Sequence, residues 1–244
     1  MKPTTLDVAP GITRRTVVSL TFFMVLAVFL PAVSFAAERQ NVTLTTSGGT
    51  RLTLSVVTST LYRPGSKLPV ILALPPGAGD LAMVNAFLAN YWLEEADRRG
   101  YIIVSPTVMG RSLETAAQDV LDTVFGWMNE NMTYDEERIV IAGQSNGGLG
   151  AFHAARVEPD RFTGMIVMPG GFGGQGSLDM LSGMPILMAV GERDTGWVEL
   201  TRNTRDLLVL AGAEPVVDVV PGAGHVFPYD PEDLFDWIEA TFPD

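Results

Sequence analysis

The sequence predicts a doubly wound α/β domain with a mostly parallel sheet, and three observations lead to this fold class. Unbroken apolar runs recur along the chain, as expected of strands that are covered on both faces. The segments between them carry apolar residues three and four positions apart, which is typical of amphipathic helices. An alternating pair of segments comes first and predicts an N-terminal antiparallel hairpin. Because strand and helix alternate after it, the sheet should be mostly parallel, with helices on both faces.

Each element can be placed along the chain. The hairpin is expected over residues 42–45 and 51–56, on either side of a Ser-Gly-Gly turn. The apolar runs that predict the parallel strands are residues 70–74, 101–104, 139–142, 165–168, 186–190 and 216–220. Helices are expected over residues 83–92, 113–128 and 198–210, with one more after Ser145 and a last one that begins at Pro231.

An export signal is predicted over residues 1–36. Arg14 and Arg15 precede an apolar run over residues 17–30, and the small-residue pattern Ser34-Phe35-Ala36 follows it. Cleavage after Ala36 would leave residues 37–244 as one catalytic domain in the periplasm or outside the cell. The arginine pair resembles a twin-arginine signal, while the very apolar run suits the general secretory route equally. An uncleaved anchor is the alternative, although the run is shorter than the roughly 20 residues of a membrane-spanning helix.

The composition excludes several kinds of site. The chain has no cysteine, and therefore no disulfide, no thiolate metal site, no acylated lipid anchor and no cysteine nucleophile. It has two histidines and no clustered carboxylates, so neither a metal nor another cofactor is expected. Removing residues 1–36 changes the formal charge from −12 to −14, and so acidic a surface repels nucleic acid and anionic membrane.

A nucleophile motif stands between a predicted strand and a predicted helix. The residues after the strand at 139–142 read Gly143-Gln144-Ser145-Asn146-Gly147, which fits the pattern G-x-S-x-G of a nucleophile elbow. Such a turn holds the serine in a strained backbone conformation, so the flanking positions must lack clashing side chains. Gly143 and Gly147 meet that need, and Ser145 is the candidate nucleophile.

A serine hydroxyl needs a base within hydrogen-bond reach, and the chain offers two histidines. His225 lies in a glycine-rich loop just after the last predicted strand, where it can reach over the carboxyl edge of the sheet. His153 lies within the helix that follows the elbow, where a packed or solvated histidine is expected. His225 is therefore the candidate base.

The base needs a carboxylate to fix its tautomer, and the order serine, acid, histidine along the chain points to Asp194. Asp194 follows the predicted strand at 186–190, in a loop at its carboxyl end. Glu192 is the alternative acid, because it lies closer to the end of the strand. The sequence leaves both open, with Asp194 preferred.

Acyl transfer also needs backbone N–H donors where the oxyanion develops. The amide of Asn146, directly after the nucleophile, should supply one. The second should come from the loop Pro75-Pro76-Gly77-Ala78-Gly79-Asp80, where we assign it to Ala78, with Gly77 as the neighbour that could replace it. An ordinary strand-to-helix turn is the alternative reading of this loop.

Together these residues resemble the α/β-hydrolase superfamily over the whole mature chain. The motifs around Ser145, Asp194 and His225 are most similar to secreted polyhydroxybutyrate depolymerase-like proteins, feruloyl esterases and predicted serine esterases or peptidases. Two departures stand out: Pro76-Gly77 replaces the His-Gly of many members, and the disulfides of many secreted relatives are impossible here. The segment 170–183 is short and glycine-rich where larger members insert a cap, so the resemblance implies little or no lid.

The leading hypothesis is a secreted serine hydrolase that cleaves small-molecule or polymeric carboxylic esters through a Ser-His-Asp triad and an acyl-enzyme. A serine peptidase is the alternative among enzymes, because the same machinery cleaves amides. A non-catalytic binding module on this scaffold is the alternative from another class. Trp197 and Phe227 each lie just beyond a predicted triad residue and are candidates to line an acyl or aromatic pocket, with loop packing as the other reading.

Overall fold

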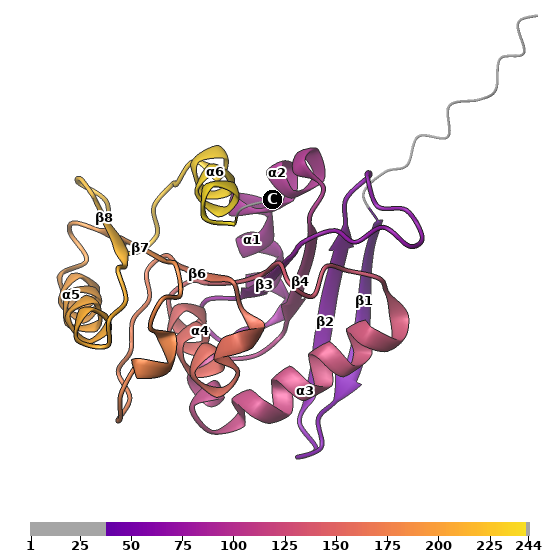
Figure 1. Ribbon diagram of the computed structural model, residues 1–244, viewed down its shortest axis with the longest axis horizontal. Helices are drawn as coiled ribbons and strands as arrows, with labels where there is room; N and C mark the ends of the chain where they lie inside the picture. Colours follow the sequence, from indigo (N-terminus) through magenta and orange to yellow (C-terminus); the bar gives the residue numbers. More distant parts are fainter. Residues whose placement is uncertain (1–37, 243–244) are drawn as a thin grey trace, which may run out of the picture. The chain divides into compact units, whose positions relative to one another are not determined.

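A computed structural model describes residues 38–242 and places in them an eight-stranded sheet with helices on both faces (Figure 1). The strand order is β1-β2-β4-β3-β5-β6-β7-β8. The hairpin strands β1 (Glu38–Thr45) and β2 (Arg51–Thr58) pair antiparallel, and β2 pairs antiparallel with β4. The remaining pairs are parallel. The predicted signal segment, residues 1–36, lies outside the described residues.

The central strands are buried along their whole length, as their unbroken apolar runs predict. They are β3 (Val70–Leu74), β4 (Ile102–Pro106), β5 (Ile139–Gly143), β6 (Gly164–Val167) and β7 (Ile186–Gly191). The prediction is wrong for β8 (Val216–Val220), which is not covered on both faces. This strand ends the sheet and pairs with β7 alone, so that Val216 remains 50% exposed.

The predicted helices form, and one further helix was not predicted. They are α1 (Leu81–Tyr91), α3 (Leu113–Asn131), α4 (Asn146–Val157), α5 (Thr195–Leu210) and α6 (Pro231–Thr241). The additional helix is α2 (Leu93–Arg99), whose sequence is mostly charged and buries little more than Glu95 and Ala96. Such a segment has no apolar stripe by which the sequence could reveal it.

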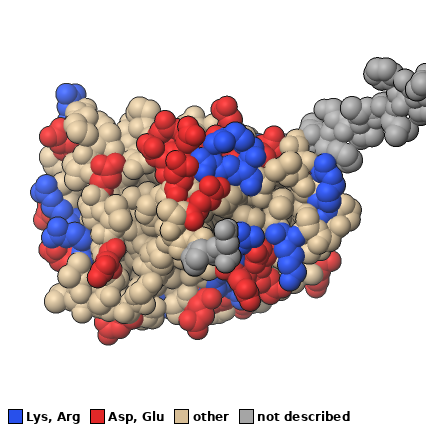
Figure 2. Space-filling model, turned by 45° about the horizontal axis from the view of Figure 1, so that its top comes forward, with Lys and Arg blue, Asp and Glu red and all other residues tan. Residues whose placement is uncertain are grey.

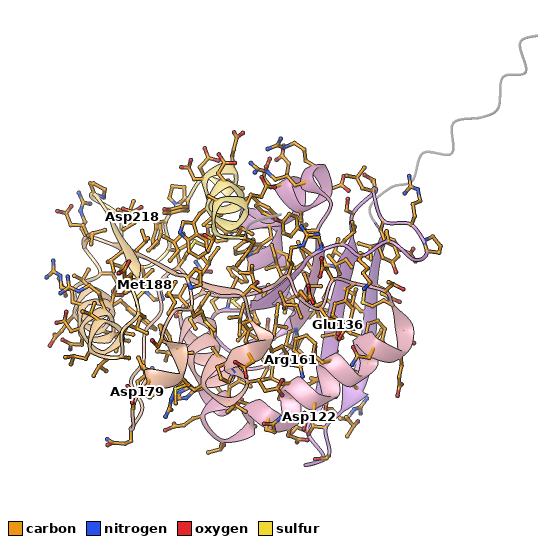
Figure 3. The ribbon with its side chains drawn as sticks, in the orientation of Figure 1. Asp122, Glu136, Arg161, Asp179, Met188 and Asp218 are labelled. Carbon is orange, nitrogen blue, oxygen red and sulfur yellow. The ribbon has the colours of Figure 1, made fainter. Side chains whose placement is uncertain are left out.

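Two apolar cores lie on opposite faces of the sheet. One lies under α3, α4 and α5 and includes Met188 of β7, which is labelled in Figure 3. The other lies under α1, α2 and α6 and is rich in aromatic rings, with Trp92 against Phe87 and Phe235. Three short 3-10 helices complete the fold: η1 (Gly110–Ser112), η2 (Pro159–Arg161) and η3 (Asp179–Leu181).

The segment between β6 and β7 is short, as the sequence indicates. Its only helical part within the described residues is η3, so this segment forms no cap over the carboxyl edge of the sheet. Among residues 38–242, no helix has the length and apolar character needed to cross a membrane. On the face that carries α2 and α6, basic side chains are bordered by acidic ones, as Figure 2 shows.

Candidate active site

Ser145 stands between the end of β5 and the start of α4, in the predicted strand-turn-helix context. Its φ of 56° is the only positive φ of a non-glycine residue in the described part of the chain. The glycines beside it let the turn pack closely: a Cβ on Gly143 would lie 2.3 Å from the Gly147 carbonyl oxygen, and one on Gly147 would lie 2.1 Å from that of Leu74. The N–H of Ser145 donates to the Pro169 carbonyl at 2.7 Å. The strained backbone is thus held from both sides.

His225 bridges the serine and a carboxylate. Its Nε2 lies 2.9 Å from the Ser145 hydroxyl oxygen, and its Nδ1 lies 2.6 Å from Oδ2 of Asp194. The Asp194 side chain is 17% exposed and that of His225 is 40% exposed, so the imidazole can be reached from solvent. Three residues from the ends of three strands therefore form one continuous chain of polar contacts.

The two candidate acids have different partners. Asp194 stands at the start of α5 and contacts His225. Glu192, two residues earlier, turns its carboxylate to the N–H of Gly222, which donates to it at 2.7 Å. The geometry therefore brings Asp194, and not Glu192, to the imidazole.

The predicted oxyanion donors lie on two segments joined by a side chain. The amide of Asn146 heads α4, and the Asn146 side chain donates from Nδ2 to the Gly77 carbonyl at 2.8 Å. Arg111 donates in turn from Nε to Oδ1 of Asn146 at 2.9 Å. Within the described residues, the N–H groups of Gly77 and Ala78 donate no hydrogen bond, so both are free to meet a ligand. Sequence reasoning missed Arg111, which lies 35 positions from Asn146 and belongs to no motif.

Trp197 and Phe227 have different surroundings. The Trp197 ring lies 5.3 Å from the His225 ring, at an interplanar angle of 45°. The Phe227 ring is 2% exposed and packs in the aromatic core, so its contacts are those of loop packing. Substrate contact stays a prediction for both residues. A cleft of about 470 Å³ lies beside Phe227, between the end of α1 and residues 226–231, and none of Ser145, Asp194 and His225 lines it.

His153 lies apart from these contacts. It is half-buried on α4, with its ring 5.8 Å from that of Phe172. Burial lowers the pKa of His153, which is the behaviour of a packed histidine. Within residues 38–242, no group of three or more His, Cys, Asp or Glu side chains is placed to hold a metal ion.

The comparisons with known proteins agree with this geometry. Residues 23–172, more than half of the chain, match the model of the Esterase family, described as "Putative esterase". The chain belongs to the Esterase family. The matched region of this esterase includes Ser145, Asn146 and Ala78, while Asp194 and His225 lie beyond it. A search with the sequence among curated proteins finds no match.

Solved structures with the same fold include esterases, a serine hydrolase and a "putative dipeptidyl aminopeptidase IV" from Bacteroides ovatus. A ferulic acid esterase from the anaerobic fungus Anaeromyces mucronatus has a TM-score of 0.69 at 15% identity, covering 83% of this chain and 89% of that chain. A feruloyl esterase module from Clostridium thermocellum has a TM-score of 0.63 at 13% identity, covering 83% and 87%. A fluorophosphonate-binding serine hydrolase from Staphylococcus aureus has a TM-score of 0.64 at 15% identity, covering 85% and 99%.

The similarity of these structures to this chain shows its fold and confirms the predicted fold class. The family match and the fold together identify this chain as a carboxylic ester hydrolase of the α/β-hydrolase type.

Proposed function

We propose that this esterase works through a triad of Ser145, His225 and Asp194 and a covalent acyl-enzyme. The observation that carries the proposal is the continuous contact from the Ser145 hydroxyl, through both nitrogens of His225, to the carboxylate of Asp194. A nucleophile, a base within hydrogen-bond reach and a group that orients the base are the parts that covalent acyl transfer requires.

In the proposed reaction the Ser145 oxygen attacks the ester carbonyl carbon while Nε2 of His225 takes the hydroxyl proton. Asp194 holds the Nδ1–H of His225 and stabilises the imidazolium. The ester bond breaks, the imidazolium gives its proton to the departing alcohol, and the acyl group stays on Ser145. Water then attacks the acyl-enzyme with His225 as base, which releases the acid and restores Ser145.

The oxyanion of each tetrahedral intermediate is assigned to the amides of Asn146 and Ala78, with Gly77 as the alternative to Ala78. Removing one such donor costs about 10²- to 10³-fold in kcat in a comparable site. The free N–H groups of the Gly77–Ala78 segment and the position of Asn146 at the head of α4 support this assignment.

The proposed substrates are small-molecule or polymeric carboxylic esters. The short segment between β6 and β7 leaves the site without a cap there, and the Trp197 ring beside His225 offers an apolar surface to an acyl group. Related structures contain ferulic acid or sinapinate, so aromatic acids belong in the test. A panel of esters of graded acyl length, a hydroxycinnamate ester, a polyester and a peptide amide would define the preference.

Labelling with a fluorophosphonate probe tests the mechanism. Wild-type protein should be labelled at Ser145, whereas Ser145→Ala should lose labelling and most turnover while it keeps its thermal unfolding transition. His225→Ala should lose turnover to a similar extent. His153→Ala is the matched control and should keep turnover near the wild-type value. Full turnover in Ser145→Ala, or a reversed order of the two histidine variants, would refute the proposed triad.

Export is also part of the proposal. We assign residues 1–36 to a cleaved signal peptide and residues 37–244 to the catalytic domain, because the basic start, the apolar run and the small residues before Ala37 stand in the order that signal peptidase substrates have. Intact mass and N-terminal sequencing of exported protein should give a chain that begins at Ala37. Replacing Arg14 and Arg15 together by lysine separates the two export routes, because the twin-arginine route alone depends on that pair.

A further inference from the structure

A buried tyrosine hydroxyl joins the segment of the proposed nucleophile to the segment of the proposed base. Tyr91, the last residue of α1, donates from its hydroxyl to the Phe227 carbonyl at 2.7 Å. The same hydroxyl accepts a hydrogen bond from Nε2 of Gln144 at 3.2 Å. Gln144 immediately precedes Ser145, and Phe227 is the second residue after His225. The Tyr91 hydroxyl oxygen therefore connects the segment that contains Ser145 to the segment that contains His225.

The three groups of this bridge are shielded from water. Tyr91 is 3% exposed, Gln144 5% and Phe227 2%. Burial raises the pKa of Tyr91, so its hydroxyl stays a neutral donor, and the ring is fixed 5.7 Å from that of Phe87. A buried donor or acceptor that loses its partner cannot turn to solvent, so neither end of the bridge is easily replaced.

The loop that carries His225 needs an anchoring contact of this kind because it crosses the ends of two strands. It starts from β8 at the edge of the sheet and reaches Ser145 at the end of β5, and β6 and β7 lie between these two strands. The start of the loop is held on the β7 side, where the N–H of Arg193 donates to the Ala223 carbonyl at 2.8 Å. Beyond His225, the contact with Tyr91 holds the loop on the β5 side.

We propose that Tyr91 is a positioning residue that sets the alignment of His225 with Ser145 by joining Phe227 to Gln144. This inference rests on the proposed catalytic roles of Ser145 and His225. Within the described residues Tyr91 makes no hydrogen bond or ring contact with either of them, and it acts through the two segments that carry them. Its removal should therefore slow both the formation and the hydrolysis of the acyl-enzyme, because His225 moves the proton in each step.

The test is Tyr91→Phe, which keeps the ring and removes one oxygen. On a small activated ester we expect kcat to fall by about 10- to 100-fold, since a small displacement of aligned reacting groups costs up to roughly 10²-fold. KM should stay close to the wild-type value, because no group that meets the substrate is lost. The rate constant for fluorophosphonate labelling should fall in parallel with kcat.

Tyr229→Phe is the matched control. Its hydroxyl also bonds near the His225 loop, but to Asp218 at the edge of the sheet, and its ring lies 6.4 Å from that of Phe227. This variant loses a tyrosine hydroxyl without breaking the link to Gln144, so kcat should stay within about twofold of wild type. Thermal unfolding of both variants, with kinetics well below the lower transition, separates loss of folded protein from loss of alignment.

A second variant tests the bridge as a unit. Gln144→Met removes the amide at the other end, and the double variant with Tyr91→Phe should lose little more than Tyr91→Phe alone, because both changes break the same connection. Three results would each overturn the inference. The first is a wild-type kcat in Tyr91→Phe, and the second is an equal fall of kcat in Tyr91→Phe and Tyr229→Phe. The third is a double variant in which the two single-variant reductions of kcat multiply. If Ser145→Ala is inactive while Tyr91→Phe is unimpaired, only the proposed role of Tyr91 fails. If Ser145→Ala stays active, the proposed function and the role of Tyr91 both fail.

Discussion

The carboxylate of Glu192 accepts a hydrogen bond from the N–H of Gly222 at 2.7 Å, three residues before His225. Gly222 has a φ of 68°, a conformation that favours glycine. Glu192 thus ties the loop after β7 to the loop after β8, while Asp194, two residues on, contacts the imidazole. Two neighbouring carboxylates therefore have different partners, a backbone N–H of the loop for Glu192 and the imidazole of His225 for Asp194.

Charge-removing variants of these two acids should have unequal effects. Asp194→Asn favours the wrong tautomer of His225, so kcat should fall by up to about 10⁴-fold. Glu192→Gln keeps an oxygen that can accept from Gly222, and kcat should stay within about tenfold of wild type. Steady-state kinetics on a chromogenic ester measures both. A larger loss in Glu192→Gln would contradict the assignment of the acid.

The side chain of Asn146 should contribute to turnover independently of its backbone N–H. Arg111→Ala leaves the Asn146 amide in place but removes the hydrogen bond that holds its side chain against the Gly77 carbonyl. We expect kcat to fall by about 2- to 10-fold, the effect of one lost solvent-exposed hydrogen bond, with KM for an uncharged ester unchanged. A rise in KM at unchanged kcat would show instead that Arg111 contacts the substrate.

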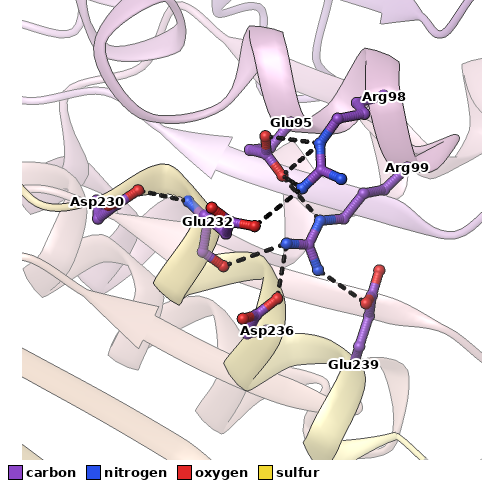
Figure 4. A network of polar contacts seen from close by, with 7 residues as sticks. All are labelled: Glu95, Arg98, Arg99, Asp230, Glu232, Asp236 and Glu239. Atoms are coloured by element: carbon purple, nitrogen blue, oxygen red, sulfur yellow. Dashed lines mark hydrogen bonds and ion pairs between the residues drawn. The ribbon is translucent and has the colours of Figure 1, made fainter.

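The ion pairs between α2 and α6 should stabilise the fold unequally (Figure 4). The Arg99 side chain is 10% exposed and contacts three carboxylates, those of Glu95, Asp236 and Glu239, at 2.6 to 2.8 Å. Arg99→Met removes a nearly buried guanidinium that three carboxylates share and should lower the free energy of unfolding by about 1 to 3 kcal/mol. Arg98, whose side chain is 55% exposed, is the control, and Arg98→Met should cost less than about 1 kcal/mol. Urea unfolding that gave equal losses would disprove this ranking.

The turn of the N-terminal hairpin should add a pH-dependent contribution to stability. Hydrogen bonds from the hydroxyl of Ser47 and from the N–H groups of Ser47 and Gly48 lower the pKa of Asp119 on α3 to about 2. A carboxyl whose pKa is lower in the folded state stabilises the fold above its unfolded pKa of about 3.9, and the contribution is lost as the pH falls toward about 2. The difference in melting temperature between wild type and Asp119→Asn should therefore shrink over that range.

Asp122→Asn, one turn further along α3, is the control for this pH effect. Within the described residues, Asp122 accepts a hydrogen bond from the side chain of Gln118 and from no backbone N–H of the hairpin. Its melting temperature should follow that of wild type over the same pH range. A constant difference between wild type and Asp119→Asn down to about pH 2 would show that the hairpin contact does not depend on the charge.

Local sequence determined most of the elements and two of the candidate residues. The apolar runs predict β3, β5, β6 and β7 because a strand buried on both faces leaves no polar position to interrupt the run. Ser145 could be found because the elbow is a local structure: strand, turn, glycines and helix lie within a few consecutive residues. Of the two histidines, His225 could be preferred as the candidate base because it follows the last predicted strand in a glycine-rich loop, whereas His153 lies within a predicted helix.

Tertiary structure decided the relations between residues far apart in the sequence. Asp194 lies 31 positions from His225, and Ser145 lies 80 positions from it, so only the packed strands set those distances. The choice between Asp194 and Glu192 depended on the course of the loop after β7, which both residues share. Tyr91 gave no signal in the sequence, because an aromatic residue on the apolar face of a helix looks like any core residue, and its hydroxyl gains its partners only once the His225 loop and the elbow lie beside α1. Local propensity and burial act between neighbours along the chain, whereas the alignment of reacting groups depends on contacts that exist only after the sheet has brought its strand ends together.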